Sequence, residues 1–484
     1  MSNNIFYTLQ KISYLDQKLQ TYAQSDYYPF HMPGHKRAPL EFPNPYSIDI
    51  TEIDEFDNLY YAEGILKEAQ KRAAELYGSK RSFYLINGST CGVLSAISAA
   101  LPRNGTLLMS RNSHKSAYHA AYLRQLETIY LLPASTQFGI SGSIPPAYVE
   151  QALHDFPQTG CVFITSPTYD GIVSDIRAIA DLAHAHNIPL IVDEAHGAHF
   201  PFSKDFPSSA LECGADLVIQ SLHKTLPCLT QTALLHVNSD LIDLDLLKRF
   251  LNIYQTSSPS YVLMSSMEQC IRFLKEESAK PMAKFTELLH QFYQTAKEFH
   301  HIQIFDKTSC EPGTCFDHDF SKILIAAGDT GLTGKELHDI LLQDYHLQME
   351  MTSGHYVVAL TSLKDTSIGF QRLLSALEMI DRKYHPSQSQ ENPLTAEMIY
   401  QMPKPGMSLS QAMEQHTETL PLKASIGHVS QEYIYLYPPG IPLVAPGEIL
   451  TGNILRTIAQ CEKQGLSVIG LHDAKNNNIH VVKI

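Results

Sequence analysis

Seven short apolar runs between residues 82 and 237, mostly separated by helical stretches, constrain the fold of this chain most strongly. Apolar strands that alternate with helices are typical of a mainly parallel sheet with helices on both faces. We therefore expect an α/β fold built on a seven-stranded sheet. The predicted strands span residues 82–86, 106–110, 128–132, 161–165, 188–192, 217–221 and 232–237.

Two of these predicted strands end next to residues with the chemistry of a cofactor site. Asp193 follows the run at 188–192, and Lys224 follows the run at 217–221. Pyridoxal phosphate needs an amine for its aldehyde and a carboxylate for its pyridine nitrogen. The pair Asp193 and Lys224 therefore suggests a pyridoxal phosphate site.

A turn of small polar residues, Asn87-Gly88-Ser89-Thr90-Cys91-Gly92, follows the first predicted strand and precedes a helix at 93–100. Unpaired amides and hydroxyls at such a helix start can bind a phosphate, although similar turns also serve only as helix caps. The turn belongs to the same strand series as Asp193 and Lys224. We therefore interpret Ser89, Thr90 and Cys91 as part of a phosphate site.

Ligands of such sheets bind where the parallel strands have their carboxyl ends. Besides the residues above, His114, Thr168 and His196 are expected at this edge. His114 could stack on the cofactor ring and relay a proton; without the cofactor it is an ordinary loop histidine. The seven residues expected there are Ser89, Thr90, His114, Thr168, Asp193, His196 and Lys224.

A zinc hydrolase is a rival interpretation, because the spacing of Asp193, His196 and His199 is compatible with metal ligation. That interpretation leaves Lys224 and the Ser89–Thr90 turn unexplained. We therefore expect no metal in the site.

The composition and charge of the chain indicate which kinds of partner it can bind and where in the cell it is expected. The chain has 484 residues and a formal net charge of −14, so we expect no basic face for nucleic acid and a small-molecule partner instead. The amino terminus does not resemble a targeting signal, and no run of about 18 apolar residues occurs. These features predict a cytoplasmic protein that does not contact membranes.

The pattern changes after residue 260, where long helices are predicted at 261–274 and 281–299 and a capping box at Thr333 opens another helix. The polar, proline-bounded segment 385–393 is typical of a linker. The expected divisions are an N-terminal helix (within 5–25) and arm at 1–45, a large cofactor-binding domain at 46–260, a small α/β domain at 261–384, the linker, and an α+β C-terminal domain at 394–484.

Five blocks in the same order resemble the Orn/Lys/Arg decarboxylase family of pyridoxal phosphate enzymes. They are Pro33-Gly34-His35-Lys36, Asp193-Glu194-Ala195-His196-Gly197, Ser221-Leu222-His223-Lys224 with the following Thr230-Gln231-Thr232-Ala233, the segment 255–261, and Tyr437-Pro438-Pro439-Gly440-Ile441-Pro442. The chain is similar to the family from about residue 28 to its carboxyl terminus. It most resembles the short branch of Gram-positive bacteria, although Pro227-Cys228 after the lysine departs from the usual small residues.

The resemblance implies the aspartate aminotransferase fold, known as fold type I, and a role for each matched residue. Lys224 joins the cofactor aldehyde, Asp193 pairs with the pyridine nitrogen and His114 stacks on the ring. The resemblance also implies phosphate contacts from Ser89, Thr90, Ser221 and His223, with Thr256 or Ser257 contributed by a partner subunit. Because a partner subunit contributes to the site, the resemblance implies a homodimer or a pair of dimers. A decamer is not expected, because this chain starts close to the Pro-Gly-His block, without the wing domain of the large enterobacterial members.

The expected reaction is decarboxylation of a basic amino acid to a polyamine precursor and CO2, with arginine preferred to lysine or ornithine. An aminotransferase or aldolase reaction, or a cofactor-binding protein without turnover, remains the alternative. A basic substrate needs a carboxylate partner, and Glu350, Glu448, Asp54 and Asp57 are the acidic candidates in the matched blocks. His35 is a further candidate for substrate contact.

Overall fold

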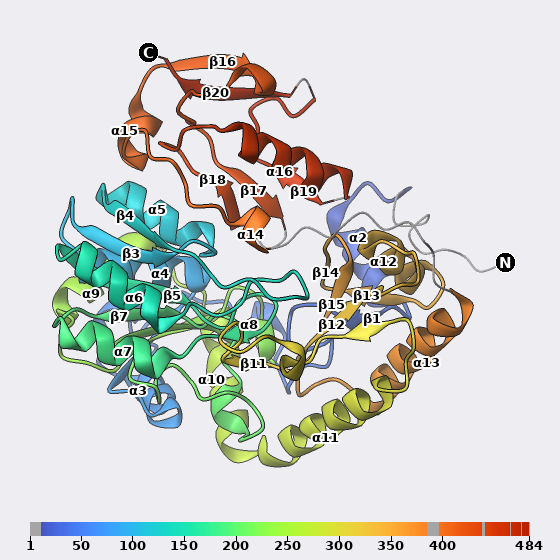
Figure 1. Cartoon of the computed structure of the whole chain (residues 1–484). Helices are drawn as coiled ribbons and strands as arrows, with labels where there is room; N and C mark the ends of the chain where they lie inside the picture. The colour runs from blue at the N-terminus through green and yellow to red at the C-terminus, as the bar shows by residue number, and fades with distance from the viewer. Residues whose placement is uncertain (1–10, 385–395, 438–440, 465, 476, 484) are drawn as a thin grey trace.

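The computed structural model describes residues 11–384, 396–437, 441–464, 466–475 and 477–483. Figure 1 shows three parts: a large sheet with its helices, a smaller sheet beside it, and a C-terminal part that lies across the top of the view. Across the described residues, every helix is too short or too polar to cross a lipid bilayer. The predicted linker at 385–393 lies outside the described residues.

The large sheet has seven strands in the order β2-β9-β8-β7-β5-β3-β4. β9 is antiparallel to both of its neighbours and the other pairs are parallel, so six strands point in one direction. The predicted seven-stranded, mainly parallel sheet is therefore confirmed. Its strands are β2 (Arg81–Leu85), β3 (Thr106–Ser110), β4 (Glu127–Leu131), β5 (Thr159–Thr165), β7 (Leu190–Asp193), β8 (Leu217–Ser221) and β9 (Ala233–Val237).

The strands have unbroken apolar runs because both faces of the sheet are covered. Successive side chains of a strand point to opposite faces. In β5, Val162 and Ile164 accordingly pack in one core cluster, whereas Cys161 and Phe163 pack in another. Helices α3 (Ile65–Tyr77), α6 (Pro146–Asp155), α7 (Ile176–Ala185) and α10 (Tyr261–Glu276) cover the first face, and α4 (Gly88–Ala100), α5 (Lys115–Arg124) and α9 (Leu244–Tyr254) cover the second.

The small part is built on a four-stranded antiparallel sheet in the order β10-β12-β15-β14. Its helices pack on one face, and the capping box that we predicted at Thr333 opens α12. A short arm strand, β1 (Tyr28–Phe30), pairs in parallel with β13 (Leu347–Met349) of this part. The remaining elements are β10 (Gln303–Ile304), β12 (Lys322–Ala326), β14 (Met351–Thr352), β15 (Tyr356–Leu360), α11 (Ala279–Ala296), α12 (Gly334–Gln343) and α13 (Ser367–Lys383).

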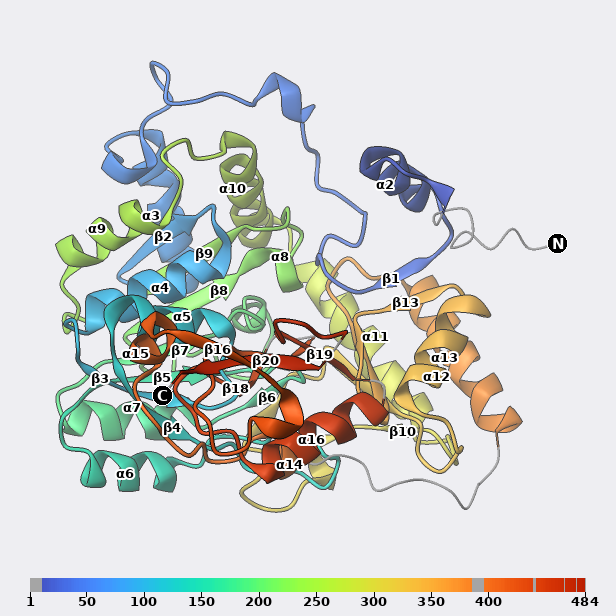
Figure 2. The ribbon, with the colours of Figure 1, turned by 90° about the horizontal axis from the view of Figure 1, so that it is seen from above.

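The N-terminal segment and several short elements complete the first two parts. Of the helix that we expected within 5–25, the described portion is α2 (Leu15–Ala23), which lies apart from the large sheet in Figure 2. A two-stranded pairing of β6 (Ile172–Val173) with β11 (Asp317–His318) links the large and small parts. The chain also has the short helix α8 (Leu222–Thr225) and 3-10 turns at 45–47, 59–61, 200–202 and 307–309.

The C-terminal part has its own small core, which includes Ile434, Leu443, Ile458 and Ile479. Two small antiparallel sheets, β16-β20 and β18-β17-β19, pack with one longer helix. Figures 1 and 2 show this part above the large sheet, on the side of β3, β4 and α5. Its elements are α14 (Ala396–Ile399), α15 (Leu409–Glu414), β16 (Thr417–Pro421), a 3-10 turn at 422–424, β17 (Ile434–Tyr437), β18 (Ile441–Val444), α16 (Gly452–Lys463), β19 (Ser467–Ile469) and β20 (Asn478–Val482).

Candidate active site

The site residues gather at one edge of the large sheet because six of its strands share a direction. Asp193 is the last residue of β7, and Ser221 is the last residue of β8. His114 comes shortly after β3 and caps α5, while Ser89 lies in the first turn of α4, just after β2. The carboxyl ends of these parallel strands thus bring together residues from four separate stretches of sequence.

Lys224 lies on α8, a single helical turn that begins directly after β8. Its Nζ is 2.9 Å from Nε2 of His196. Burial lowers the pKa of Lys224, although the nearby carboxylates of Asp193 and Glu350 act in the opposite direction. A lowered pKa makes the neutral, nucleophilic form of the amine more accessible than it is for a lysine in water.

His196 holds the lysine from the loop that follows β7. Burial, and then the charge of Lys224, lower the pKa of His196 well below its usual range, so the ring is neutral. The Tyr169 ring contacts it edge to face at 4.9 Å between centroids. Its second nitrogen, Nδ1, is buried without a hydrogen-bond partner among the described residues, which leaves a polar atom available to a bound molecule.

Asp193 is a buried carboxylate, 5% exposed, whose Oδ1 accepts a hydrogen bond of 3.1 Å from the backbone N–H of Ala195. Burial raises its pKa, and the charge of Lys224 offsets only part of this effect. A buried carboxylate in this condition is stabilised by any cationic N–H group that comes close to it.

Two hydroxyls meet where β8 ends and α4 begins. Oγ of Ser89 is 2.6 Å from Oγ of Ser221. The helix starts at Gly88, five residues earlier than we expected, so the Gly/Ser/Thr turn forms its first turn and presents the unpaired N–H groups of the helix amino terminus. Thr90 is exposed there, whereas the Cys91 thiol is buried and donates to the carbonyl of Gly88, so its side chain faces the helix.

Histidines 114 and 223 flank this edge in different ways. Burial, and then the Lys224 charge, lower the pKa of His114 to about 3, and its Nδ1 lies 2.9 Å from Oγ of Ser116. His223 donates from Nδ1 to the carbonyl of Thr232 at 2.9 Å, which leaves Nε2 as an acceptor. Burial lowers the pKa of His223 to about 4.

The hydrogen bonds of Thr168 and Thr256 are with residues other than Lys224. Oγ1 of the buried Thr168 accepts a hydrogen bond from the backbone N–H of Ile172, within the turn after β5. Thr256 and Ser257 are exposed, and the backbone N–H of Thr256 donates to Asn87 beside the start of α4 in the same chain.

The Pro33–Lys36 block packs against the turn that carries Lys224. The backbone N–H of Gly34 donates to the carbonyl of His223 at 2.7 Å. Nζ of the buried Lys36 donates to the carbonyls of Pro29, His31 and Leu360 at 2.5–3.0 Å. His35 accepts from the N–H of Arg37 through Nδ1 and takes part in the local turn.

Glu350 lies between β13 and β14 and approaches the site from the small part. Its Oε2 accepts a 2.7 Å hydrogen bond from the backbone N–H of Met32, and its Oε1 accepts one from the Tyr169 hydroxyl. Each oxygen keeps a second lone pair. Sequence reasoning did not find Tyr169, because a tyrosine in a loop has no distinguishing pattern.

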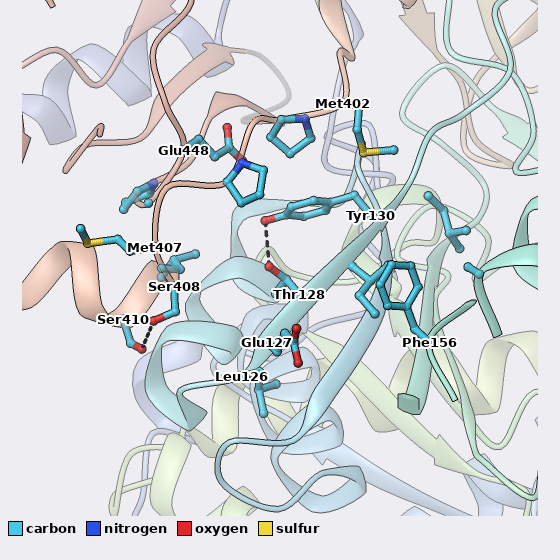
Figure 3. A pocket seen from close by; sticks show the side chains of 18 of the residues that line it. Leu126, Glu127, Thr128, Tyr130, Phe156, Met402, Met407, Ser408, Ser410 and Glu448 are labelled. Carbon is cyan, nitrogen blue, oxygen red and sulfur yellow. Dashed lines mark hydrogen bonds between the residues drawn. The ribbon is translucent and has the colours of Figure 1, made fainter. Parts of the chain in front are cut away.

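The other acidic candidates have structural partners or lie on the surface. Glu448 forms a buried ion pair with Arg111 at 2.6 and 3.0 Å, so the structure gives it a role in joining the C-terminal part. Asp57 accepts hydrogen bonds from four backbone N–H groups, three of its own loop and one of the first turn of α3, and Asp54 is exposed. Figure 3 shows Glu448 at the rim of a groove of about 1270 Å³, which is lined by β4, α6 and residues 402–414 and does not include Lys224.

A buried network below His196 was also missed from the sequence. Nζ of Lys322 donates to Asp319 at 2.7 Å and to the backbone carbonyl of His196 at 3.4 Å. His199, which the zinc interpretation required as a ligand, points at Asp319 instead, at 3.2 Å. These contacts connect the small part to the loop that carries His196. The sequence indicates them only weakly, because His196 lies 126 residues from Lys322.

The residues present fit pyridoxal phosphate. Lys224 would provide the amine, Asp193 would offer a buried carboxylate to the pyridine nitrogen, and the Ser89–Ser221 pair at the start of α4 would offer a place for the phosphate. Nδ1 of His196, which has no hydrogen-bond partner in the described part of the chain, would leave one more polar contact for the cofactor.

Comparisons with known proteins agree with this fit. Models of the major and C-terminal domains of Orn/Lys/Arg decarboxylases match residues 14–321 and 392–471. Arginine decarboxylases of Bacillus anthracis and Bacillus subtilis (strain 168) are each 28% identical to this chain, over 94% and 96% of both sequences respectively.

Solved structures show the same fold. The lysine decarboxylase of Francisella novicida has a TM-score of 0.78 at 19% identity, covering 99% of this chain and 82% of that one. A structure of SPT with PLP has a TM-score of 0.52 at 15% identity and covers 65% of this chain and 76% of that one. With a family model over more than half of its length, the chain belongs to the Orn/Lys/Arg decarboxylase family, as a pyridoxal phosphate-dependent amino acid decarboxylase of fold type I.

Proposed function

We propose that this chain decarboxylates arginine, in preference to lysine or ornithine, and so supplies a polyamine precursor in the cytoplasm. The observation that carries the proposal is the Lys224 amine, held at 2.9 Å by a neutral His196 at the carboxyl edge of the sheet. The arginine decarboxylases of the two Bacillus species, each 28% identical to this chain, support the choice of substrate.

The chain's own residues prepare the site for the reaction. We assign Lys224 as the amine that binds the cofactor, Asp193 as the partner of its pyridine nitrogen, and His114 as the ring that stacks on it. Pyridoxal phosphate, when bound, supplies an electron sink for the electron pair that remains when CO2 leaves. In this assignment Asp193 would keep a proton on the pyridine nitrogen, because its carboxylate gains stability from a cationic neighbour.

We assign the phosphate to Ser89, Thr90, Ser221 and His223. The hydroxyls of Ser89 and Ser221 and the open N–H groups at the start of α4 are suited to an anion. Nε2 of His223 is an acceptor in the neutral ring, so it would meet a protonated oxygen or a bridging water there. We assign the walls of the cofactor site to Cys91, Thr168 and His196.

Glu350 is our candidate for recognising the substrate side chain. The Met32 N–H and the Tyr169 hydroxyl orient its carboxylate, and its charge acts on Lys224. A carboxylate oriented in this way suits a guanidinium, which donates two parallel hydrogen bonds. The ion pair with Arg111 makes Glu448 the weaker candidate, and His35 remains a candidate for contact through the Pro33–Lys36 block.

We also propose a homodimer, or a pair of dimers, in which Thr256 or Ser257 reaches the partner's site. The exposure of both residues beside the start of α4 supports this assignment. The separate sheets support domain limits at 1–45, 46–260, 261–384 and 394–484, joined by a linker at 385–393. Sedimentation of the purified holoenzyme would test the assembly: a monomer at micromolar concentration contradicts it.

A product assay tests the reaction. Holoenzyme should release CO2 and the matching amine from arginine faster than from lysine or ornithine, and Lys224→Ala should release neither and should lose the borohydride-trapped adduct. Formation of a keto acid without CO2 would favour an aminotransferase. No turnover of any basic amino acid would contradict the proposed substrate class.

Glu350→Gln tests the substrate contact. It keeps the shape and the hydrogen-bond acceptor for Met32 but removes the charge, so KM for arginine should rise by about tenfold or more, in line with about 1.5–3 kcal/mol for a hydrogen bond to a charged group. The visible absorbance of the bound cofactor should persist. An unchanged KM would remove Glu350 from substrate recognition.

A further inference from the structure

Three side chains of the C-terminal part, all more than 200 residues after Lys224 in the sequence, lie close together. They are Glu432, just before β17, His472, just after β19, and His480 in β20. One ligand atom from each lies within 4.8 Å of the other two. The proposed function uses none of these residues.

Backbone hydrogen bonds hold Glu432 in place. Its Oε2 accepts from the backbone N–H groups of both His472 and His480, each at 3.1 Å. Its own N–H donates to Oγ of Ser430 at 3.2 Å, and that hydroxyl donates to the Glu432 carbonyl at 2.8 Å. The carboxylate is therefore fixed by backbone N–H groups after β19 and within β20, and Oε1 takes no part in these two hydrogen bonds.

The second oxygen of Glu432 and one ring nitrogen of His480 have nearly the spacing of metal ligands, and the His472 ring lies beside them. Oε1 of Glu432 is 3.5 Å from Nδ1 of His480, and the rings of His472 and His480 stack with centroids 3.7 Å apart. Zn²⁺ at bond lengths of about 2.0–2.1 Å holds tetrahedral ligands roughly 3.3–3.4 Å apart. Oε1 of Glu432 and Nδ1 of His480, at 3.5 Å, are close to this separation, and His472 is exposed and has room to rotate toward them.

We propose that Glu432, His472 and His480 bind one divalent transition-metal ion, with Zn²⁺ the best match to two imidazoles and one carboxylate and with solvent in the fourth position. The ion would connect the segment before β17 to His472 and to β20, which lie on either side of the bridge between Asp473 and Asn478. Its role is structural: it stabilises the C-terminal part. The hydrogen bonds to Oε2 persist beside the ion and orient the carboxylate, as second contacts of metal ligands do.

Equilibrium dialysis of the holoenzyme against buffered Zn²⁺, with the metal counted by mass spectrometry, tests the site. The variants are His472→Ala and His480→Ala, and the matched control is His416→Ala, an exposed histidine of the same part outside the cluster. Wild type and control should bind one ion per chain with the same affinity, and both cluster variants should bind at least about tenfold more weakly. Zn²⁺ should raise the melting temperature of wild type and control only.

Equal zinc affinity in wild type and His472→Ala would overturn the proposal, as would binding that all four proteins share, for example at free thiols. His472 is exposed, so its alanine variant should fold. It decides the question by itself if His480→Ala proves unstable. Cofactor absorbance, measured in every sample, separates loss of the metal site from loss of the Lys224 site.

Discussion

At the scale of single residues, the surroundings of two buried aspartates shift their pKa values in opposite directions. Asp319 forms a 2.7 Å ion pair with Lys322, which lowers its pKa well below the usual range despite burial. Asp193, in contrast, has a pKa raised by burial. The folded-state pKa of Asp193 lies above the ordinary 3.8, so at a pH between these two values the folded chain holds a proton that the unfolded chain has released. The contribution of Asp193 to stability therefore falls as the pH rises from 3.8 through its folded-state pKa.

Asp193→Asn should therefore leave the cofactor-free protein as stable as wild type, or more stable, at neutral pH, while abolishing most decarboxylation. The reason is that the substitution removes a buried carboxylate whose unfavourable burial the charge of Lys224 offsets only in part. Urea unfolding of the cofactor-free protein and a CO2 assay measure the two effects.

Asp319→Asn is the matched control for this prediction. It strips Lys322 of its partner and should cost about 3–5 kcal/mol, as expected for one half of a buried ion pair. A destabilisation of Asp193→Asn as large as that of Asp319→Asn would contradict our account of Asp193.

Residue identities could be predicted where chemistry and strand position coincide. Asp193 and Lys224 each follow an apolar run, and the structure places both at the expected edge. Partners supplied by a different part of the chain, such as Lys322 beneath His196, could not be predicted, because nothing local distinguishes them. The ion pair of Glu448 could not be predicted from the sequence for the same reason, since its partner Arg111 lies 337 residues away.

At the scale of elements, α8 depends on the close approach of the Pro33–Lys36 block. A Cβ on Gly34 would lie 2.6 Å from N and 2.7 Å from O of Leu226. These are backbone atoms, which cannot rotate away as the end of a side chain could. The block and the Lys224 turn can therefore keep their present spacing only with glycine at this position.

Gly34→Ala should destabilise the protein by about 1–3 kcal/mol, the usual cost of overpacking, and lower kcat by displacing Lys224. Gly452→Ala is the control, because its Cβ would meet nothing closer than Ile426 at 4.0 Å. Denaturant unfolding and steady-state kinetics on both variants check the expectation. Wild-type kinetics in Gly34→Ala would show that α8 tolerates a shift of the arm.

Elements were predicted most accurately where their local pattern is complete. The seven strands have apolar residues on both faces, and the Thr333 capping box contains its own start signal. The start of α4 was placed too late, because Gly and Ser residues are weak helix formers and only the tertiary setting makes them helical here.

At the scale of the whole molecule, one ion pair anchors the C-terminal part to the large sheet. Arg111 follows β3 and is 2% exposed, and it makes two hydrogen bonds with Glu448 and one of 3.1 Å with the carbonyl of Leu443. The Tyr130 ring covers its guanidinium at 4.8 Å.

Glu448→Gln should leave the Arg111 charge buried without its counterion and cost about 3–5 kcal/mol. The C-terminal part should then become sensitive to proteases before the large sheet unfolds. The double variant Arg111→Met with Glu448→Met should recover most of this loss, because no charge remains buried. Limited proteolysis and unfolding curves on wild type, Glu448→Gln and the double variant test the prediction, and a double variant no more stable than Glu448→Gln would contradict it.

The arm at the beginning of the chain has a consequence for synthesis on the ribosome. Lys36 bonds to the carbonyl of Leu360, 324 residues later, and β1 pairs with β13. At about 5–20 residues per second, the arm must wait roughly 16–65 s for these partners to emerge. The large sheet can form in that interval, but the Pro33–Lys36 block reaches its final contacts only after the small part appears. Maturation of the Lys224 site is therefore timed by the translation of a distant segment.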